Sequence, residues 1–172
     1  MTKGPLELVP LTPAAIEAML DGRPEEAGRL LGIELPEEPA SDGERSFLGL
    51  RLRQMREDER FLTWCPHAVV LDGRMIGQAG FHGPPGVNAA ENPRAVEFGY
   101  GIFPQHRGRG YATRAAMLLM ELTRERGVHE FVLSSSPDNE PSLAIIRKLG
   151  FVKTGERMDD EDGLEHVFEL RP

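Results

Sequence analysis

The sequence predicts one α+β domain, residues 1–172, built on a mixed, mostly antiparallel sheet of six to seven strands with helices on both faces. Three observations lead to this prediction. Strand-like and helix-like segments follow one another as strand, helices, two strands, strand–loop–helix, strand–helix and two strands. A buried strand, Val96–Phe103, runs through a short glycine-containing loop into a helix that opens at Tyr111. A length of 172 residues suits one domain with a sizeable core.

Alternating apolar residues predict the strands, and apolar residues three or four positions apart predict the helices. Thr12 and Pro13 suit the N-cap and first position of the first helix, and Asp72-Gly73 is a typical β-hairpin turn. Gly127 suits the end of the helix that opens at Tyr111. The elements are expected, in chain order, as strand 6–11, helices 13–20, 24–31 and 41–60, strands 63–71, 75–81 and 96–103, helix 111–126, strand 129–134, helix 139–149, and strands 151–157 and 164–170.

Composition and charge narrow the possible partners. A net charge of −8 and a pI near 5.2 argue against nucleic-acid binding, which needs a broad basic face. Apolar runs fall short of the ~20 residues of a membrane span, and the N-terminus lacks a signal pattern, so we expect a cytoplasmic protein without a membrane partner. The single cysteine, Cys65, and five histidines without metal-ligand spacing predict that no metal is bound. Three lysines against 17 arginines indicate a bacterial source.

The loop after the central strand has the properties of an anion site. A helix N-terminus presents unpaired amides and roughly half a positive charge. Gly108 and Gly110 lack a Cβ, so a ligand can approach the backbone closely and φ can be positive. His106, Arg107 and Arg109 add donors and positive charge to a chain that is acidic overall. We therefore expect a phosphate group at this helix N-terminus.

The spacing of the loop excludes two common phosphate motifs. The Walker A pattern is absent, and the dinucleotide fingerprint fails after its second glycine. Gln105-x-x-Gly108-x-Gly110-Tyr111-Ala112 instead resembles the acyl-CoA pyrophosphate loop of the GNAT superfamily of N-acetyltransferases. About thirty residues later, Asn139-x-x-Ser142 and Lys148-Leu149-Gly150-Phe151 are similar to the closing motif of that superfamily. Their spacing resembles the ribosomal-protein (RimJ/RimL-type) branch.

The resemblance implies a GNAT-like fold in which the central strand and the next strand splay apart. It also implies transfer of an acetyl group from acetyl-CoA, as co-substrate, to a primary amine by direct attack on the thioester. The acceptor would be a protein N-terminus or a small amine, and the protein a monomer or homodimer. The residues implied for acetyl-CoA binding are Gly101, Ile102 and Phe103 at the pantetheine arm, the amides of Arg107, Gly108, Arg109, Gly110, Tyr111 and Ala112 at the pyrophosphate, and Asn139 at the arm or a site water.

The acceptor amine must lose a proton, and a carboxylate is the expected base. Glu97, on the central strand just before the implied splay, is the first candidate, and Glu161 in the late acidic turn is the alternative. A backbone N–H near Ile102 or Phe103 is expected to hold the oxyanion that forms on the thioester.

The donor for the leaving thiolate is less obvious. Many relatives have a tyrosine four residues before the Gly-Phe pair, and this position is Ile146 here. The resemblance to the ribosomal-protein branch implies that Ser142 donates a hydrogen bond to the sulfur, with helix capping as its alternative role. Tyr100 is the remaining polar candidate. Because the tyrosine is missing, a non-catalytic acyl-CoA-binding or interaction module stays open as the alternative function.

Overall fold

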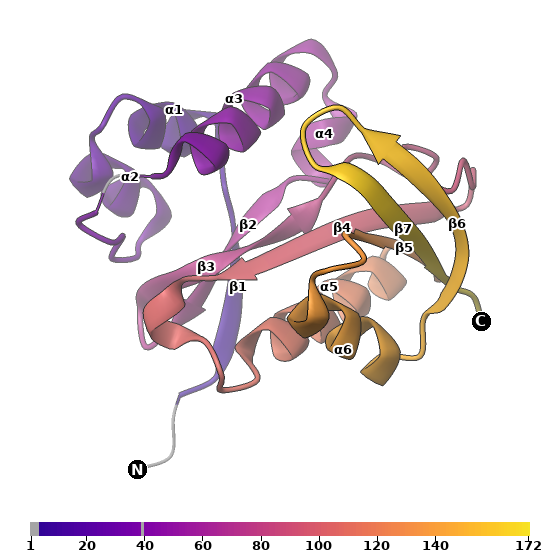
Figure 1. Ribbon diagram of the computed structural model, residues 1–172. Coiled ribbons are helices and arrows are strands. Elements are labelled where there is room, and N and C mark those ends of the chain that lie inside the picture. Colours follow the sequence, from indigo (N-terminus) through magenta and orange to yellow (C-terminus); the bar gives the residue numbers. More distant parts are fainter. Residues whose placement is uncertain (1–3, 39) are drawn as a thin grey trace.

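The computed structural model describes residues 4–38 and 40–172, which form helices on both faces of one sheet (Figure 1). The elements are β1 (Leu6–Pro10), α1 (Pro13–Leu20), α2 (Pro24–Leu31), α3 (Asp42–Glu57), α4 (Arg60–Thr63), β2 (Pro66–Leu71), β3 (Arg74–Phe81), β4 (Ala95–Ile102), a 3-10 turn (Pro104–His106), α5 (Tyr111–Glu125), β5 (Glu130–Ser135), α6 (Glu140–Lys148), β6 (Val152–Asp159) and β7 (Gly163–Leu170).

The sheet has seven strands in the order β1-β2-β3-β4-β5-β7-β6. Only the pairing of β4 with β5 is parallel among the described strands, since α5 carries the chain back between them. The predicted fold class is therefore confirmed. The sequence did not predict that β7 would lie between β5 and β6.

The helix expected over residues 41–60 is shorter than predicted. It begins after Ser41, whose Oγ accepts from the amide of Glu44 at 3.2 Å, and it ends at Glu57. Asp58 then adopts an extended backbone, and its Oδ1 accepts from the Arg60 amide at 3.0 Å, which turns the chain into α4. The next strand consequently starts at Pro66 and not at Thr63.

Two hydrophobic layers cover the sheet. On one face, α5 and α6 place Leu119 and Ile146 against a cluster that includes Phe98 and Phe131. On the other face, α1 and α3 bury residues such as Leu48 against β2 and β3. Figure 1 shows the same arrangement, with α1–α3 on one side of the sheet and α5 and α6 on the other. Central strand β4 is thus covered from both sides.

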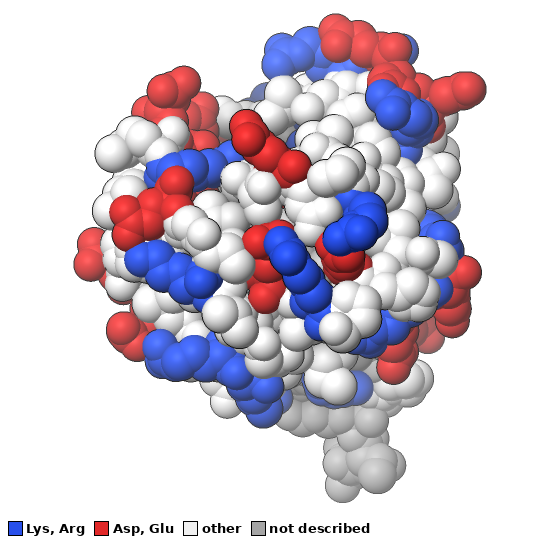
Figure 2. Space-filling view, turned by 90° about the vertical axis from the view of Figure 1, so that its right-hand side faces the viewer, with Lys and Arg blue, Asp and Glu red and all other residues white. Residues whose placement is uncertain are grey.

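The outer edge of the sheet is polar. Strand β6 pairs only with β7 in the described chain, and most of its residues are exposed. Lys153 and Glu156 form an ion pair at 2.7 Å on this edge strand, which discourages pairing with another sheet. Figure 2 shows basic and acidic side chains interspersed over the face that it presents. Among the described residues, no helix is both long and apolar enough to cross a membrane.

A buried histidine makes stability depend on pH. His67 on β2 is 2% exposed and its Nδ1 lies 3.0 Å from the Cys65 carbonyl oxygen. Burial lowers the pKa of His67 from 6.5 to about 4. The folded protein therefore binds this proton more weakly than the unfolded chain does, and stability falls as pH drops from 6.5 towards 4.

We predict that His67→Gln removes this part of the acid sensitivity. Between pH 7.5 and pH 4.5, the free energy of unfolding of the wild type should fall by about 2–3 kcal/mol more than that of the variant. Urea unfolding at the two pH values measures the difference, with the exposed His129→Gln as the matched control. Equal losses in wild type and His67→Gln would show that the imidazole is not the cause.

Candidate active site

Strands β4 and β5 separate after a short stretch of parallel pairing. Their register covers Ala95–Glu97 opposite Glu130–Val132. Beyond it β4 stays with β3 as far as Ile102, while β5 follows β7 to Ser135. The splay implied by the family resemblance is thus present, and a cavity of about 350 Å³ fills it. Its walls come from β4, β5, α6 and β7.

A second cavity, of about 330 Å³, lies across β4 between α3, β3 and the loop after β4. The alternation of β4 explains it. Phe98, Tyr100 and Ile102 face the α5–α6 layer, so Gly99 and Gly101 face α3, where they leave space that side chains would fill. Gly99 and Tyr100 line both cavities. Two molecules that enter from opposite faces of the sheet can therefore meet at this point of β4.

The loop that follows β4 ends in a glycine pair with left-handed backbones. Gly108 has φ 77° and Gly110, the N-cap of α5, has φ 79°. Nothing lies within 4 Å of the position that a Cβ would take on either glycine. The amide of Arg114 donates to the Gly110 oxygen at 3.1 Å, so the amides that precede it project along the helix axis. This geometry suits an anion, as the sequence predicted.

Two of the backbone assignments made from the sequence need correction. In the β3–β4 ladder, the amide of Phe103 donates to Ile76 at 2.9 Å and the amide of His82 donates to Glu97 at 2.9 Å. Odd-numbered residues of β4 therefore direct their backbone groups to β3, and even-numbered residues direct theirs to the splay. Phe103 and Gly101 cannot offer backbone groups to a ligand there. Tyr100 can offer its backbone groups, and Ile102 can offer its amide, since the Ile102 oxygen already accepts from Nε of Arg107.

Arg107 is also used differently from the prediction. Its amide donates to Pro104 at 3.3 Å within the 3-10 turn, so it is not available to a pyrophosphate. Its Nε donates to the Ile102 oxygen at 2.8 Å, which folds the side chain back over the strand. The candidate pyrophosphate amides are consequently those from Gly108 to Ala112. Tyr111 offers only its backbone, because its ring is 2% exposed in the core.

The predicted polar residues of α6 meet Tyr100 in the splay. Asn139 caps the helix, and its Oδ1 accepts from the Ser142 amide at 3.2 Å. Ser142 is therefore not the cap, and its Oγ lies 3.4 Å from the Tyr100 hydroxyl. Burial raises the pKa of Tyr100, although the hydrogen bond to Ser142 works in the opposite direction. The phenol thus keeps its proton at neutral pH.

Glu97 is the most buried of the predicted catalytic residues, at 1% exposure. Its carboxylate pairs with Nδ1 of His82 and accepts from the Ala89 amide at 2.9 Å and from Ser134 Oγ at 3.3 Å. Burial works to raise the pKa of Glu97, but the hydrogen bond and charge of His82 and the Ala89 amide outweigh it, so the pKa is lowered. The side chain that reaches the α3-side cavity is His82.

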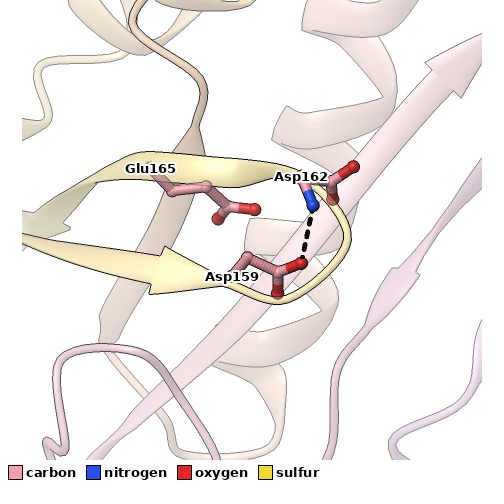
Figure 3. A group of neighbouring side chains, drawn as sticks. All are labelled: Asp159, Asp162 and Glu165. Carbon is pink, nitrogen blue, oxygen red and sulfur yellow. Dashed lines mark hydrogen bonds between the residues drawn. The ribbon is translucent and has the colours of Figure 1, made fainter.

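The alternative base, Glu161, lies exposed in the β6–β7 turn, where its amide donates to Asp159 at 2.9 Å. Figure 3 shows three other carboxylates of this region, those of Asp159, Asp162 and Glu165, which approach within 4.8 Å of one another. Arg157 lies 3.6 Å from Asp159 and 3.7 Å from Glu165, and the Asp162 amide donates to Asp159. Through these contacts the three residues stabilise the β6–β7 turn.

Two residues of the site were not predicted from the sequence. His82 follows a strand and precedes a Gly-Pro-Pro segment, and nothing local ties it to Glu97, fifteen positions later. Glu165 lines the splay cavity, and burial raises its pKa while Arg157 opposes the rise. The local sequence around Glu165 gives no signal of this kind, because the burial of its carboxyl group depends on elements far away in sequence.

Comparison with known proteins identifies the family. Residues 6–152 match the acetyltransferase (GNAT) domain. The chain belongs to the GNAT acetyltransferase family. Spermidine N(1)-acetyltransferase of Escherichia coli K12 is 38% identical over 68 residues, which cover 39% of this chain and 37% of that protein. The chain thus matches little more than a third of the length of this curated relative.

Solved GNAT structures share the fold over nearly the whole chain. The yncA protein of Salmonella typhimurium, solved with its cofactor acetyl-CoA, has a TM-score of 0.62 at 17% identity and covers 98% of this chain and 94% of its own. RimL, the ribosomal L7/L12 α-N-protein acetyltransferase, in complex with coenzyme A, has a TM-score of 0.65 at 18% identity, covering 99% and 98%. At these identities the likeness concerns the fold, and it includes the RimL-type branch that the motifs resembled.

Proposed function

We propose that this GNAT domain transfers an acetyl group from acetyl-CoA to a primary amine. One observation carries the proposal: two cavities on opposite sides of β4 meet at Gly99 and Tyr100, and an anion-binding helix terminus lies at the end of the same strand. A transferase needs this arrangement, because both substrates must hold their reacting atoms about 3–3.5 Å apart while they enter separately.

Acetyl-CoA would lie on the α5–α6 side. Its pyrophosphate would bind the amides from Gly108 to Ala112, and its pantetheine arm would run along the backbone of Ile102 and Tyr100 into the splay. Asn139 and Ser142 line the inner end of that cavity. The acetyl-CoA in the yncA structure and the coenzyme A in the RimL complex support this co-substrate for the family.

The amine would enter from the α3 side. Glu44 and Phe47 of α3 line this cavity, and Glu38 joins Glu44 in a smaller hollow beside it. Glu38 and Glu44 place two carboxylates at this entrance against the guanidinium of Arg107, and this excess of negative charge favours a cationic acceptor, whether a small amine or the N-terminus of a protein. The names of the two relatives, a spermidine acetyltransferase and a ribosomal-protein α-N-acetyltransferase, represent these two classes.

The reaction would be a direct displacement. The neutral amine attacks the thioester carbonyl carbon, a splay-facing amide of β4 such as that of Ile102 stabilises the oxyanion, and the C–S bond breaks. Tyr100, supported by Ser142, would give its proton to the departing thiolate. This pair supplies the donor that Ile146 cannot, and it weakens the case for a non-catalytic acyl-CoA-binding module. Glu97 would supply the negative charge that favours removal of the proton from the amine.

The domain organisation, location, source, metal and nucleic-acid independence and oligomeric state of the protein are predictions. We propose that residues 1–172 act as one domain, because both hydrophobic layers pack on one sheet. Cytoplasmic location, a bacterial source, independence of metal and of nucleic acid, and a monomeric or homodimeric state follow from the sequence arguments alone.

Gly110→Asp tests the co-substrate site. A carboxylate at the N-cap of α5 would occupy the space of the pyrophosphate and repel it, so the Kd for acetyl-CoA should rise about 100-fold or more, which equals about 2.8 kcal/mol. Isothermal titration calorimetry measures it. Gly22→Asp is the matched control, since Gly22 has φ 71° and an equally open Cβ position, but lies between α1 and α2. Unchanged affinity in Gly110→Asp would remove the basis of the proposal.

Tyr100→Phe and Ser142→Ala test the proton donor. Each change should lower kcat about 10- to 100-fold and leave the Kd for acetyl-CoA within about two-fold, because only the departure of the thiolate is affected. The double variant should lose no more than the worse single variant, since the two hydroxyls act as one unit. Thiol release with spermidine and with a peptide bearing a free N-terminal serine measures the rates. Additive losses, or losses as large in the exposed Ser46→Ala, would contradict this assignment.

A further inference from the structure

We propose that His82 is the group that takes the proton from the acceptor amine. In this proposal, Glu97 orients the imidazole of His82 and stabilises the imidazolium that forms. This inference rests on the proposed acetyl transfer and names the residue that makes it possible. The sequence pointed to Glu97 as the base in direct contact, and the structure offers a different way for that carboxylate to act.

The position of Glu97 argues for an indirect role. Its side chain is 2% exposed, and its oxygens are occupied by His82, the Ala89 amide and Ser134. A substrate amine would have to displace these partners before it could reach the carboxylate. His82, in contrast, has 32% of its side chain exposed and lines the α3-side cavity. In this arrangement His82 can contact the acceptor and Glu97 cannot.

The orientation of the imidazole follows from its partners. Because Nδ1 faces the Glu97 carboxylate, Nδ1 carries the hydrogen and Nε2 is left as the acceptor in the neutral ring. Nε2 lies on the Gly99 side, 3.3 Å from the position that a Cβ on Gly99 would take. Gly99 is one of the two residues at which the cavities meet, so the basic nitrogen stands beside the expected meeting point of amine and thioester.

The surrounding residues hold the ring in this orientation. From β4, the Glu97 carboxylate contacts its Nδ1. From α3, Arg51 donates to the His82 carbonyl oxygen at 2.8 Å and is 8% exposed, and Glu44 lies in the wall of the same cavity. Farther away, the charge of Arg157 helps to lower the pKa of Glu97, and the charge of Glu97 helps to raise the pKa of Glu165. The His82 backbone is thus anchored on α3 and its ring on β4.

The proton transfers balance as follows. The ammonium form of the acceptor gives one proton to Nε2 of His82, and the imidazolium that results is stabilised by the Glu97 carboxylate. The freed lone pair forms the C–N bond, the C–S bond breaks, and the thiolate takes a proton from Tyr100. As the C–S bond breaks, the nitrogen still carries one proton more than the amide holds, and that proton passes through solvent to the tyrosinate of Tyr100. After product release, His82 loses its proton to water. The net products are the N-acetyl amine, coenzyme A and one proton.

His82→Asn is the decisive variant, because the Asn amide retains a donor for Glu97 and lacks Nε2. With spermidine or the serine peptide, kcat/KM at pH 7 should fall about 100-fold or more, and the Kd for acetyl-CoA should stay within about two-fold. The deficit should shrink towards pH 9.5, where the amine loses its proton unaided. The exposed His129→Asn is the control and should match the wild type.

Glu97→Gln is the second variant, and it keeps the proposal testable if His82→Asn does not fold. Because the imidazolium that forms during the transfer loses its stabilising charge, kcat should fall about 10-fold or more, and the Kd for acetyl-CoA should stay within about two-fold. This deficit should also shrink towards pH 9.5, where the amine loses its proton unaided.

Three results would overturn the assignment: His82→Asn activity within about two-fold of the wild type, a deficit of the same size at every pH, or an unchanged kcat in Glu97→Gln. A wild type that binds acetyl-CoA but acetylates no amine would instead overturn the proposed function itself.

Discussion

Glu97 brings a carboxylate into the sheet at the last position where β4 and β5 pair, and a charge buried there has to be matched by donors. The donors come from three parts of the chain: His82 after β3, Ala89 in the following loop, and Ser134 on β5. Together they tie two strands and a long loop to one point. The splay begins directly beyond that point, so the shape of both cavities depends on these contacts.

The two faces of β4 have different surroundings. Its large side chains, Phe98 and Ile102, build the core against α5 and α6, while its glycines leave an open cavity under α3. The backbone alternates in the same way, since every second residue is bound to β3 and the others are turned towards the splay. One strand of eight residues therefore supports a core and borders two cavities.

Hydrogen bonds within the protein limit which backbone groups of the site can bind a ligand. Phe103 and Arg107 stand where the family motif places ligand-binding amides, yet one amide belongs to the β3–β4 ladder and the other to the 3-10 turn. Likewise, Ser142 was a cap or a donor on sequence grounds, and it is the neighbouring Asn139 that caps α6. A motif identifies a segment, but the partner of each buried polar group decides which atoms remain for a ligand.

The sequence by itself determined the features that depend on local residues: most element boundaries, the hairpin at Asp72-Gly73, the left-handed glycines before α5, and the motifs of the GNAT family. These features depend on backbone propensity and on spacing within a few turns. Only the tertiary structure decided that β7 lies between β5 and β6, that His82 meets Glu97, and that Tyr100 meets Ser142. The Tyr100–Ser142 contact joins residues 42 positions apart, and such contacts follow from how the strands pair and the helices cross, which no local pattern specifies.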